Sequence, residues 1–290
     1  MLKELKTFLA VAQHGTFTRA AARIGLTQAA VSAQMKRLEQ SLGFELFERK
    51  GRVAVLNEAG RATLADAQQL IALFERLQSS SGAERQAGAV RLEIGSVISV
   101  QTSFLPDAIS TLCVEMPHVR LRVVPGVSLN LLGMVDAGTL DAAVIIRPPF
   151  DLPAELVWRS LWREPFELVV PAAIKGRNWR ALLQQHPFLR YDRTSFGGRL
   201  VSQFLQTHLI SARDQVEMDE LGGLMRLVAL GRGVALLPRS ASVRSWPDGV
   251  RGVSLGKDCF YREIGMVSHV QTGHSAILDK LVHALGSGNK

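Results

Sequence analysis

Short amphipathic segments separated by glycines are the feature that most limits how the first part of this chain can fold. In residues 2–13 the apolar positions recur every three or four residues, which is the spacing of one helix face. Gly15 is suited to end that helix, because glycine adopts the left-handed conformation of a C-cap at little cost. Thr16 is a good N-cap, so the sequence predicts a second helix over residues 17–24.

The third segment completes a recognisable supersecondary pattern. Gly25 breaks the second helix, and Thr27 caps a third one that is expected to run to about Ser41. Three short helices with a glycine turn between the second and third are typical of a helix-turn-helix. Residues 45–56 can then form a short β-ribbon with Gly51 at its tip.

The third helix has two unlike sides. Its apolar residues fall on one side and are expected to pack on the first two helices. The other side is small and polar, which suits insertion into the major groove of DNA, although a merely solvated face would look the same. Gln28 can pair with adenine, Ser32 can bond to several bases, the alanines can contact thymine methyls, and the basic residues can meet phosphates. The candidate DNA-binding residues on this helix are Thr27, Gln28, Ala29, Ser32, Ala33, Lys36 and Arg37.

The charge distribution agrees with a polyanionic partner. The chain of 290 residues has 34 Lys and Arg against 26 Asp and Glu, a net charge of +8. Nine basic and five acidic residues in positions 1–60 give +4, half of the total in about a fifth of the chain. No apolar run is long enough for a membrane helix, and charges interrupt the N-terminus too early for a signal peptide. We therefore expect a cytoplasmic protein that does not bind membranes, in which the two cysteines form no disulfide framework.

A long helix is expected after the ribbon. Asn57 is a good N-cap, and the helix is predicted to continue to about Gln86, with a hinge in the serine-rich stretch 79–82. Its apolar residues alternate at intervals of three and four, which favours a dimerisation seam over packing on its own domain. The residues of this seam are Leu64, Ala67, Ile71 and Phe74.

From about residue 90 the pattern changes to alternating strands and helices. Such alternation predicts parallel sheets covered by helices on both faces. Two sets of these elements in about 200 residues indicate two lobes with a cleft between them. The predicted domains are residues 1–60, the linker helix 61–88 and residues 89–290. Within the last, one lobe comprises about 89–164 with 266–290, and the other about 165–265.

The N-terminal motifs closely resemble those of LysR-type transcriptional regulators. Further but looser similarity lies at Ile94-Gly95, at Leu105-Pro106, and in residues 138–143 and 230–238. The matching N-terminal pieces are Phe8, the run Gly15–Ala21, Gln28, Ala30-Val31-Ser32, Leu38-Glu39, Leu42-Gly43, Leu46–Arg49 and Glu58-Ala59-Gly60.

This resemblance implies an α/β protein with a winged helix-turn-helix, a long linker helix that dimerises, and a two-lobed effector domain similar to periplasmic binding proteins. The implied partners are double-stranded operator DNA, a small-molecule inducer and RNA polymerase, in a homodimer or homotetramer without a cofactor. In such a protein Arg52 would lie in the wing and reach the DNA backbone or minor groove. Ala29 and Ala33 depart from the residues common in the family, and residues 53–55 lack its frequent basic side chains.

Several polar residues follow the predicted strands of the effector domain. Ligands of α/β lobes bind outside the carboxyl ends of strands, and helix N-termini favour carboxylates. We therefore expect an inter-lobe ligand cleft for an anionic metabolite. The serines and threonine could instead be helix caps, the arginine an ion-pair partner between lobes, and the phenylalanine a core residue. The candidate ligand-binding residues are Ser99, Thr102, Ser128, Arg147 and Phe196.

Other classes of function fit the sequence less well. The seven histidines are scattered, and no metal-site spacing, nucleophile elbow, Walker loop or complete dinucleotide motif is present. The sequence thus predicts no enzyme and no metal site. An exported solute-binding protein would need a signal peptide, and an architectural DNA-binding protein would not need two cleft-forming lobes.

Overall fold

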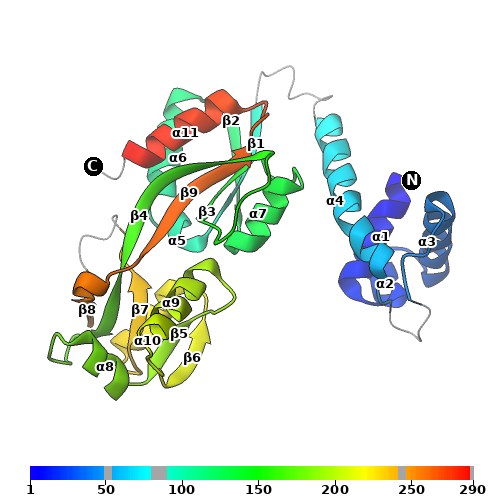
Figure 1. Ribbon diagram of the computed structural model, residues 1–290. Coiled ribbons are helices and arrows are strands. Elements are labelled where there is room, and N and C mark those ends of the chain that lie inside the picture. Colours follow the sequence, from blue (N-terminus) through cyan, green and yellow to red (C-terminus); the bar gives the residue numbers. More distant parts are fainter. Residues whose placement is uncertain (49–53, 80–89, 241–245, 288–290) are drawn as a thin grey trace. The chain divides into compact units, whose positions relative to one another are not determined.

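The computed structural model describes residues 1–48, 54–79, 90–240 and 246–287 (Figure 1). The chain divides near residue 88 into an N-terminal unit and a C-terminal unit. None of the helices in these ranges is both long and apolar enough to span a membrane.

The N-terminal unit contains the expected three helices, and their ends are set by the predicted caps. The Thr16 hydroxyl accepts a hydrogen bond from the Arg19 amide, and Thr27 accepts one from Ala30. Glycines in the left-handed conformation end all three helices. Residues Phe47 and Leu56 form an antiparallel bridge at the base of the predicted ribbon, whose tip lies outside the described residues. The helices are α1 (Leu2–His14), α2 (Phe17–Ile24) and α3 (Gln28–Leu42).

The fourth helix, α4 (Glu58–Ser79), corrects the predicted dimer seam. Ala67 and Ile71 are buried in the apolar core that also holds Phe8 of α1, and Leu64 packs against the same core. These seam residues therefore stabilise their own unit and are not available for pairing two chains. The predicted continuation of the helix to Gln86 and the hinge beyond Ser79 lie outside the described residues.

The C-terminal unit has two lobes, each with its own apolar core. In the first lobe three parallel strands lie in the order β2-β1-β3 and are accompanied by four helices. Its strands are β1 (Val90–Ser96), β2 (Val119–Pro125) and β3 (Ala142–Ile146). Its helices are α5 (Ile98–Gln101), α6 (Leu105–Glu115), α7 (Ser128–Asp136) and α11 (Ser275–Ser287).

The second lobe combines one parallel strand pair with antiparallel strands. Its parallel pair consists of β5 (Phe188–Tyr191) and β6 (Asp214–Met218). The short strands β7 (Ala235–Pro238) and β8 (Val250–Ser254) are antiparallel to a longer strand that enters from the first lobe. The helical elements are α8 (Trp179–Gln185), α9 (Phe196–Thr207), α10 (Leu221–Ala229) and the 3-10 turn η1 (Gly256–Asp258).

Two long antiparallel strands, β4 (Leu156–Pro171) and β9 (Tyr261–His269), connect the lobes (Figure 1). Strand β9 is also antiparallel to β3, so the prediction of purely parallel sheets is wrong. The physical reason is that these strands run from one lobe to the other and pair with each other along the crossing. Strand β4 pairs with β9 as far as Pro165 and from Phe166 onward with strands of the second lobe.

A buried ion pair lies at this crossing. Glu164 and Arg262 are directly opposite in the strand register, and Arg262 Nε donates to Glu164 Oε2 at 2.6 Å. The two side chains are only 2–3% exposed. The Trp162 indole donates to the other Glu164 oxygen at 3.2 Å. Because an uncompensated buried charge is far more costly than the intact pair, the two residues depend on each other.

Replacing Glu164 tests the role of this pair. Glu164→Gln keeps the shape of the side chain but leaves the Arg262 charge buried without its counter-ion. We expect the free energy of unfolding of the C-terminal unit to fall by about 3–5 kcal/mol. All four tryptophans lie in that unit, so urea denaturation followed by tryptophan fluorescence reports on it.

The matched control is Asp279→Asn, which removes the exposed partner of Arg159 and should cost less than about 1 kcal/mol. Equal losses for the two variants would contradict the structural role assigned to the buried pair.

Candidate DNA-binding surface and ligand cavity

Helix α3 presents its predicted DNA-binding residues on one exposed side. Val31, Met35 and Leu38 are buried on the opposite side, which packs on α1 and α2. Because these apolar residues fix the rotation of the helix, the small and polar residues between them face outward. The seven exposed residues are Thr27, Gln28, Ala29, Ser32, Ala33, Lys36 and Arg37.

Two details of this helix were not evident from the sequence. Gln34 is buried and accepts a hydrogen bond from the Thr7 hydroxyl of α1 at 2.5 Å, which links the two helices. Arg37 Nε lies 3.6 Å from a Glu4 carboxylate oxygen, so part of its charge is offset within the unit. Lys36 forms no ion pair with the described carboxylates. Arg52, the candidate residue of the wing, lies outside the described residues.

The C-terminal unit contains a cavity of about 300 Å³ between its lobes. The first lobe contributes residues 97–99 after β1, residues 125–128 around the end of β2, and Ile146 at the end of β3. The second lobe contributes Tyr191, Ser195 and residues 219–221. All of these positions lie at or just beyond the carboxyl ends of parallel strands, where α/β lobes bind ligands.

The serines from the first lobe offer hydrogen-bond donors. Ser99 Oγ accepts from Arg262 Nη2 at 3.1 Å, and the buried Ser128 Oγ accepts from the Ile146 amide at 3.2 Å. No described acceptor receives the hydroxyl proton of either serine. Both protons are therefore available to an acceptor in the cavity.

The second lobe contributes two carboxylates. Glu220 caps α10 and accepts from the amides of Gly222 and Gly223. Burial raises the pKa of Asp219, and the nearby Asp192 and Glu220 raise it further, whereas a hydrogen bond from Ser195 and the charge of Arg262 lower it. Asp219 Oδ1 is buried and has no hydrogen-bond partner among the described residues.

Tyr191 lies at the end of β5 and completes this side of the cavity. A tyrosine phenol is protonated at neutral pH, and burial raises the pKa of this one further, so its hydroxyl is a hydrogen-bond donor there. Gly197 lies against the ring, since a Cβ there would come within 2.4 Å of a Tyr191 ring carbon. A glycine at this position is thus needed for the tyrosine to occupy its site.

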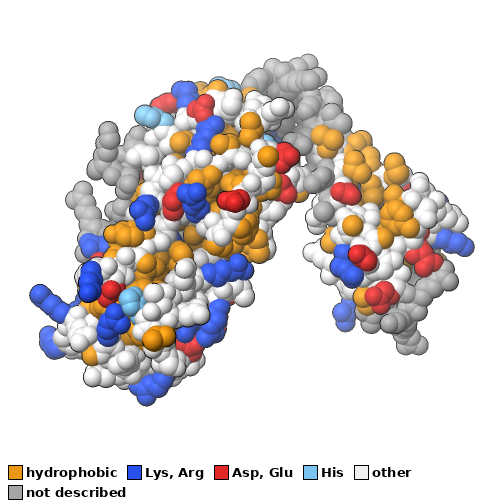
Figure 2. All heavy atoms as spheres, viewed as in Figure 1, with side chains coloured by type: hydrophobic (Ala, Val, Ile, Leu, Met, Phe, Trp, Pro, Cys, Tyr) orange, Lys and Arg blue, Asp and Glu red, His pale blue; other side chains and the backbone are white. Residues whose placement is uncertain are grey.

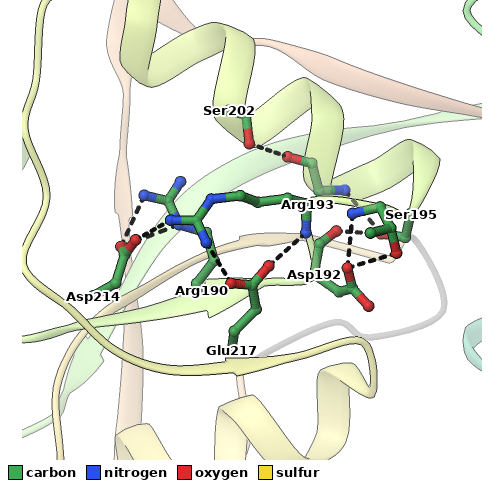
Figure 3. A network of polar contacts seen from close by, with 9 residues as sticks. Arg190, Asp192, Arg193, Ser195, Ser202, Asp214 and Glu217 are labelled. Atoms are coloured by element: carbon green, nitrogen blue, oxygen red, sulfur yellow. Dashed lines mark hydrogen bonds and ion pairs between the residues drawn. The ribbon is translucent and has the colours of Figure 1, made fainter.

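A network of ion pairs stands beside the cavity in the second lobe (Figure 3). Arg193 lies between Asp214 and Glu217 of β6 and pairs with both. Arg190 Nη2 donates to Asp214 at 2.8 Å. This network fixes the end of β5 that leads to Asp192 and Ser195. In the parts of the chain that the structure describes, no group of three or more His, Cys, Asp or Glu side chains could hold a metal ion.

Comparison with known proteins identifies both units. Residues 2–61 match the family model described as bacterial regulatory helix-turn-helix protein, lysR family, and residues 85–289 match the LysR substrate binding domain. This chain is a member of the LysR family of transcriptional regulators. The sequence-based prediction of the family and of its two-part fold is confirmed.

Named relatives extend the similarity across both units. The chain is 31% identical over 245 residues to the transcriptional regulator CbbR of Rhodospirillum rubrum, covering 82% of this chain and 80% of the relative. It is 32% identical over 249 residues to IlvR of Caulobacter vibrioides, covering 82% of each. A crystal structure of full-length CbnR complexed with target DNA shares the fold at a TM-score of 0.70, with 20% identity and 99% coverage of both chains.

Of the five residues predicted to bind the ligand of this LysR-family chain, Ser99 and Ser128 line the cavity. Thr102 is exposed, and its hydroxyl donates to the Ile98 carbonyl at 3.2 Å. Arg147 is exposed and pairs at 3.2 Å with Glu263 on the neighbouring strand β9. Phe196 is buried against Phe150 and belongs to the apolar core of the first lobe.

The polar cavity residues absent from the predicted ligand set are Tyr191, Ser195, Asp219 and Glu220. A signal for them was present, because each lies at the end of a strand or between a strand and the helix that follows it, as Ser99 and Ser128 do. Arg262 had no such signal, since it lies within a strand and approaches Ser99 only through the crossing of β4 and β9.

Replacing Asp219 tests its environment in the cavity. A carboxyl group whose pKa is raised in the folded protein lowers stability as pH rises above its pKa in the unfolded chain, because the unfolded chain ionises first, and the full loss is present above the folded-state pKa. Asp219→Asn is neutral at every pH, so we expect its melting temperature to exceed that of the wild type at pH 7.5. This advantage should shrink toward pH 4, where the wild-type carboxyl is increasingly protonated.

Calorimetry at the two pH values provides the measurement. Glu217→Gln is the control, because it removes a carboxylate of β6 that is paired with Arg193 and should bring no gain at neutral pH. A difference between Asp219→Asn and wild type that does not change with pH would contradict this description of the site.

Proposed function

We propose that this LysR-family regulator binds an operator through the exposed side of α3 and responds to a small carboxylate held between its effector lobes. The observation that carries the DNA-binding part is the orientation of α3, whose apolar side is buried and whose small and polar side is exposed. Its proposed domains are residues 1–60, 61–88 and 89–290. The CbnR complex shows the same fold on DNA, which supports this assignment.

Within α3 the proposed contacts differ in kind. Gln28 and Ser32 read base edges, with Ala29 and Ala33 against thymine methyl groups. Lys36 contacts phosphate, as do Thr27 at the helix N-terminus, Arg37 and Arg52 of the wing. The Glu4 carboxylate beside Arg37 weakens that contact relative to the one made by Lys36. Sequence preference and overall affinity for DNA therefore depend on different side chains of α3.

The long helix α4 is proposed to pair two chains through a face other than the predicted seam. Leu70 and Leu73 are about half exposed, and Figure 2 shows hydrophobic side chains gathered on the surface of α4. Such residues are costly to leave in water on a helix whose opposite side is already packed. A homodimer or homotetramer would present paired reading helices to an operator with two half-sites, near RNA polymerase.

The effector lobes are proposed to bind the inducer in the inter-lobe cavity. The free hydroxyl protons of Ser99 and Ser128 favour a carboxylate there. The N-terminus of α7 also favours a carboxylate, because its amide N–H groups carry partial positive charge. Arg147 is not part of this proposal for the cavity, because it pairs with Glu263 outside it. The ligand alters DNA binding only by binding one arrangement of the assembly more tightly than the other.

Two alanine variants test the DNA-binding part. Operator DNA is first obtained by selecting the tightest binders from random duplexes with the full-length protein. Ser32→Ala should lose affinity for the selected operator by about 1–3 kcal/mol and keep its affinity for random duplex. Lys36→Ala should weaken both duplexes about equally and reduce the salt dependence by about one phosphate contact.

Gln40→Ala serves as the control, since this exposed residue of α3 is not among the proposed contacts. Fluorescence anisotropy at several salt concentrations provides the affinities. Equal losses of Ser32→Ala on operator and random DNA would reject its base-reading role, and failure to select any sequence would reject the proposed function.

A further inference from the structure

The inter-lobe cavity is asymmetric in charge, and we propose that its ligand is a small aliphatic zwitterion. Its carboxylate would meet the serines of the first lobe, and its ammonium group would meet Asp219 of the second. This inference rests on the proposed function for the location of the ligand, but it adds the second charged group and the residue that recognises it. Four features of the cavity lead to it.

The first feature is the unsatisfied carboxylate of Asp219. This residue lines the cavity, and its buried Oδ1 has no hydrogen-bond partner in the described part of the chain. Buried polar groups in folded proteins are nearly always hydrogen-bonded, and an unmatched one is costly. The neighbouring Glu220 differs, because its oxygens accept two amides of α10. The group that complements Oδ1 must therefore be a donor. The nearby Ser195 hydroxyl donates to the Asp192 carbonyl at 2.9 Å, so the donor to Oδ1 is expected on the ligand.

The second feature is the opposite character of the first lobe. Ser99 and Ser128 accept hydrogen bonds from Arg262 and from the Ile146 amide, so their own protons remain to be donated. Two hydroxyl donors beside the N-terminus of α7 complement an acceptor with negative charge. The first-lobe wall of the cavity thus offers donors, whereas the second-lobe wall combines the Tyr191 hydroxyl with an unpartnered acceptor, Asp219 Oδ1.

The third feature is the balance of charge. Arg262 is compensated by Glu164 at 2.6 Å, so the pair adds little net charge. Asp219 and Glu220 then leave two negative charges on the cavity wall, and Asp192 stands close to Asp219. A ligand that is only anionic would meet this potential unfavourably. An ammonium group compensates it, whereas a hydroxyl donor would satisfy Oδ1 but leave the charge in place.

The fourth feature is the apolar remainder of the lining. Val97, Val127, Ile146 and Leu221 contribute aliphatic surface to the lining. A cavity of about 300 Å³ is at the small end of the range for ligand sites. This combination fits a short hydrocarbon frame with one charged group of each sign.

A competing arrangement would satisfy the same groups without an ammonium ligand. Arg262 Nη1 is also buried and unpartnered among the described residues, and Arg262 is close enough to Asp219 to affect its pKa. A small closure of the lobes could pair these two side chains with each other. In that case the cavity would accept a simple carboxylate, and Asp219 would contribute nothing to ligand choice.

Matched pairs of ligands separate these arrangements. Calorimetric titration of the full-length protein would compare glycine, alanine, valine, leucine and 4-aminobutyrate with the acids that carry hydrogen in place of the amino group. We expect at least one amino acid to bind at least tenfold more tightly than its matched acid. Asp219→Asn should reduce that affinity by about 10–100-fold, the usual value of a hydrogen bond to a charged group. It should not weaken the matched acid, because it removes a negative charge that repels an anion.

Two further variants complete the design. Ser128→Ala should weaken the amino acid and its matched acid alike, because it removes a carboxylate contact. Glu217→Gln removes a carboxylate of the adjacent ion-pair network and should change neither affinity (Figure 3). Circular dichroism and the melting temperature of each variant show that the fold is retained.

The outcomes distinguish this inference from the function on which it rests. Three results would overturn the proposal of a zwitterionic ligand. The matched acids could bind as well as the amino acids, the Asp219→Asn variant could bind both ligands as the wild type does, or no compound in the series could bind. Operator selection with the same preparations provides the separate readout. Sequence-specific DNA binding together with Ser128-dependent binding of simple acids would leave the proposed function standing.

Discussion

The pairing of β4 with β9 is the interaction on which the C-terminal unit depends. Each lobe has its own core, so apart from Phe196 of α9, which packs into the core of the first lobe, neither core holds the other lobe in place. The two strands do so by running through both lobes, and the Glu164–Arg262 pair is buried where they cross. A charge pair in such a position costs much to disrupt, because neither partner can reach water without separating the strands. The cavity exists between the lobes because this crossing holds them at a fixed spacing.

The same crossing places chemistry at the cavity. Arg262 extends from β9 to the Ser99 hydroxyl of the first lobe and lies beside Tyr191 and Asp219 of the second. A ligand that hydrogen-bonds to Ser99 or Asp219 is therefore close to Arg262, whose strand β9 connects the lobes. For a regulator, this proximity provides a physical route from occupancy of the cavity to a change in lobe arrangement. A ligand changes the equilibrium only by the difference in its affinity for two arrangements.

Local signals in the sequence were sufficient for some parts of this structure and insufficient for others. The helices α1 to α3 were predictable because their caps, glycines and apolar spacing lie within a few residues of one another. The first half of β4 was not predicted, because its partner strand lies about a hundred residues later in the chain. Spacing alone also misassigned Ala67 and Ile71, since a heptad pattern does not say which surface covers it. The tendency of ligands to bind beyond the carboxyl ends of strands located Ser99 and Ser128 and would have located Asp219. Placing Arg262 near the cavity required knowing how β4 and β9 pair.

Hydrogen exchange measured by mass spectrometry on the full-length Glu164→Gln variant tests most directly whether the crossing holds the cavity together. If it does, amide exchange should accelerate in the cavity segments of both lobes, residues 97–99 and 125–128 in one and 219–221 in the other, while helices α1 to α3 exchange as in the wild type. Faster exchange confined to β4 and β9, with both sets of cavity segments unchanged, would contradict the account.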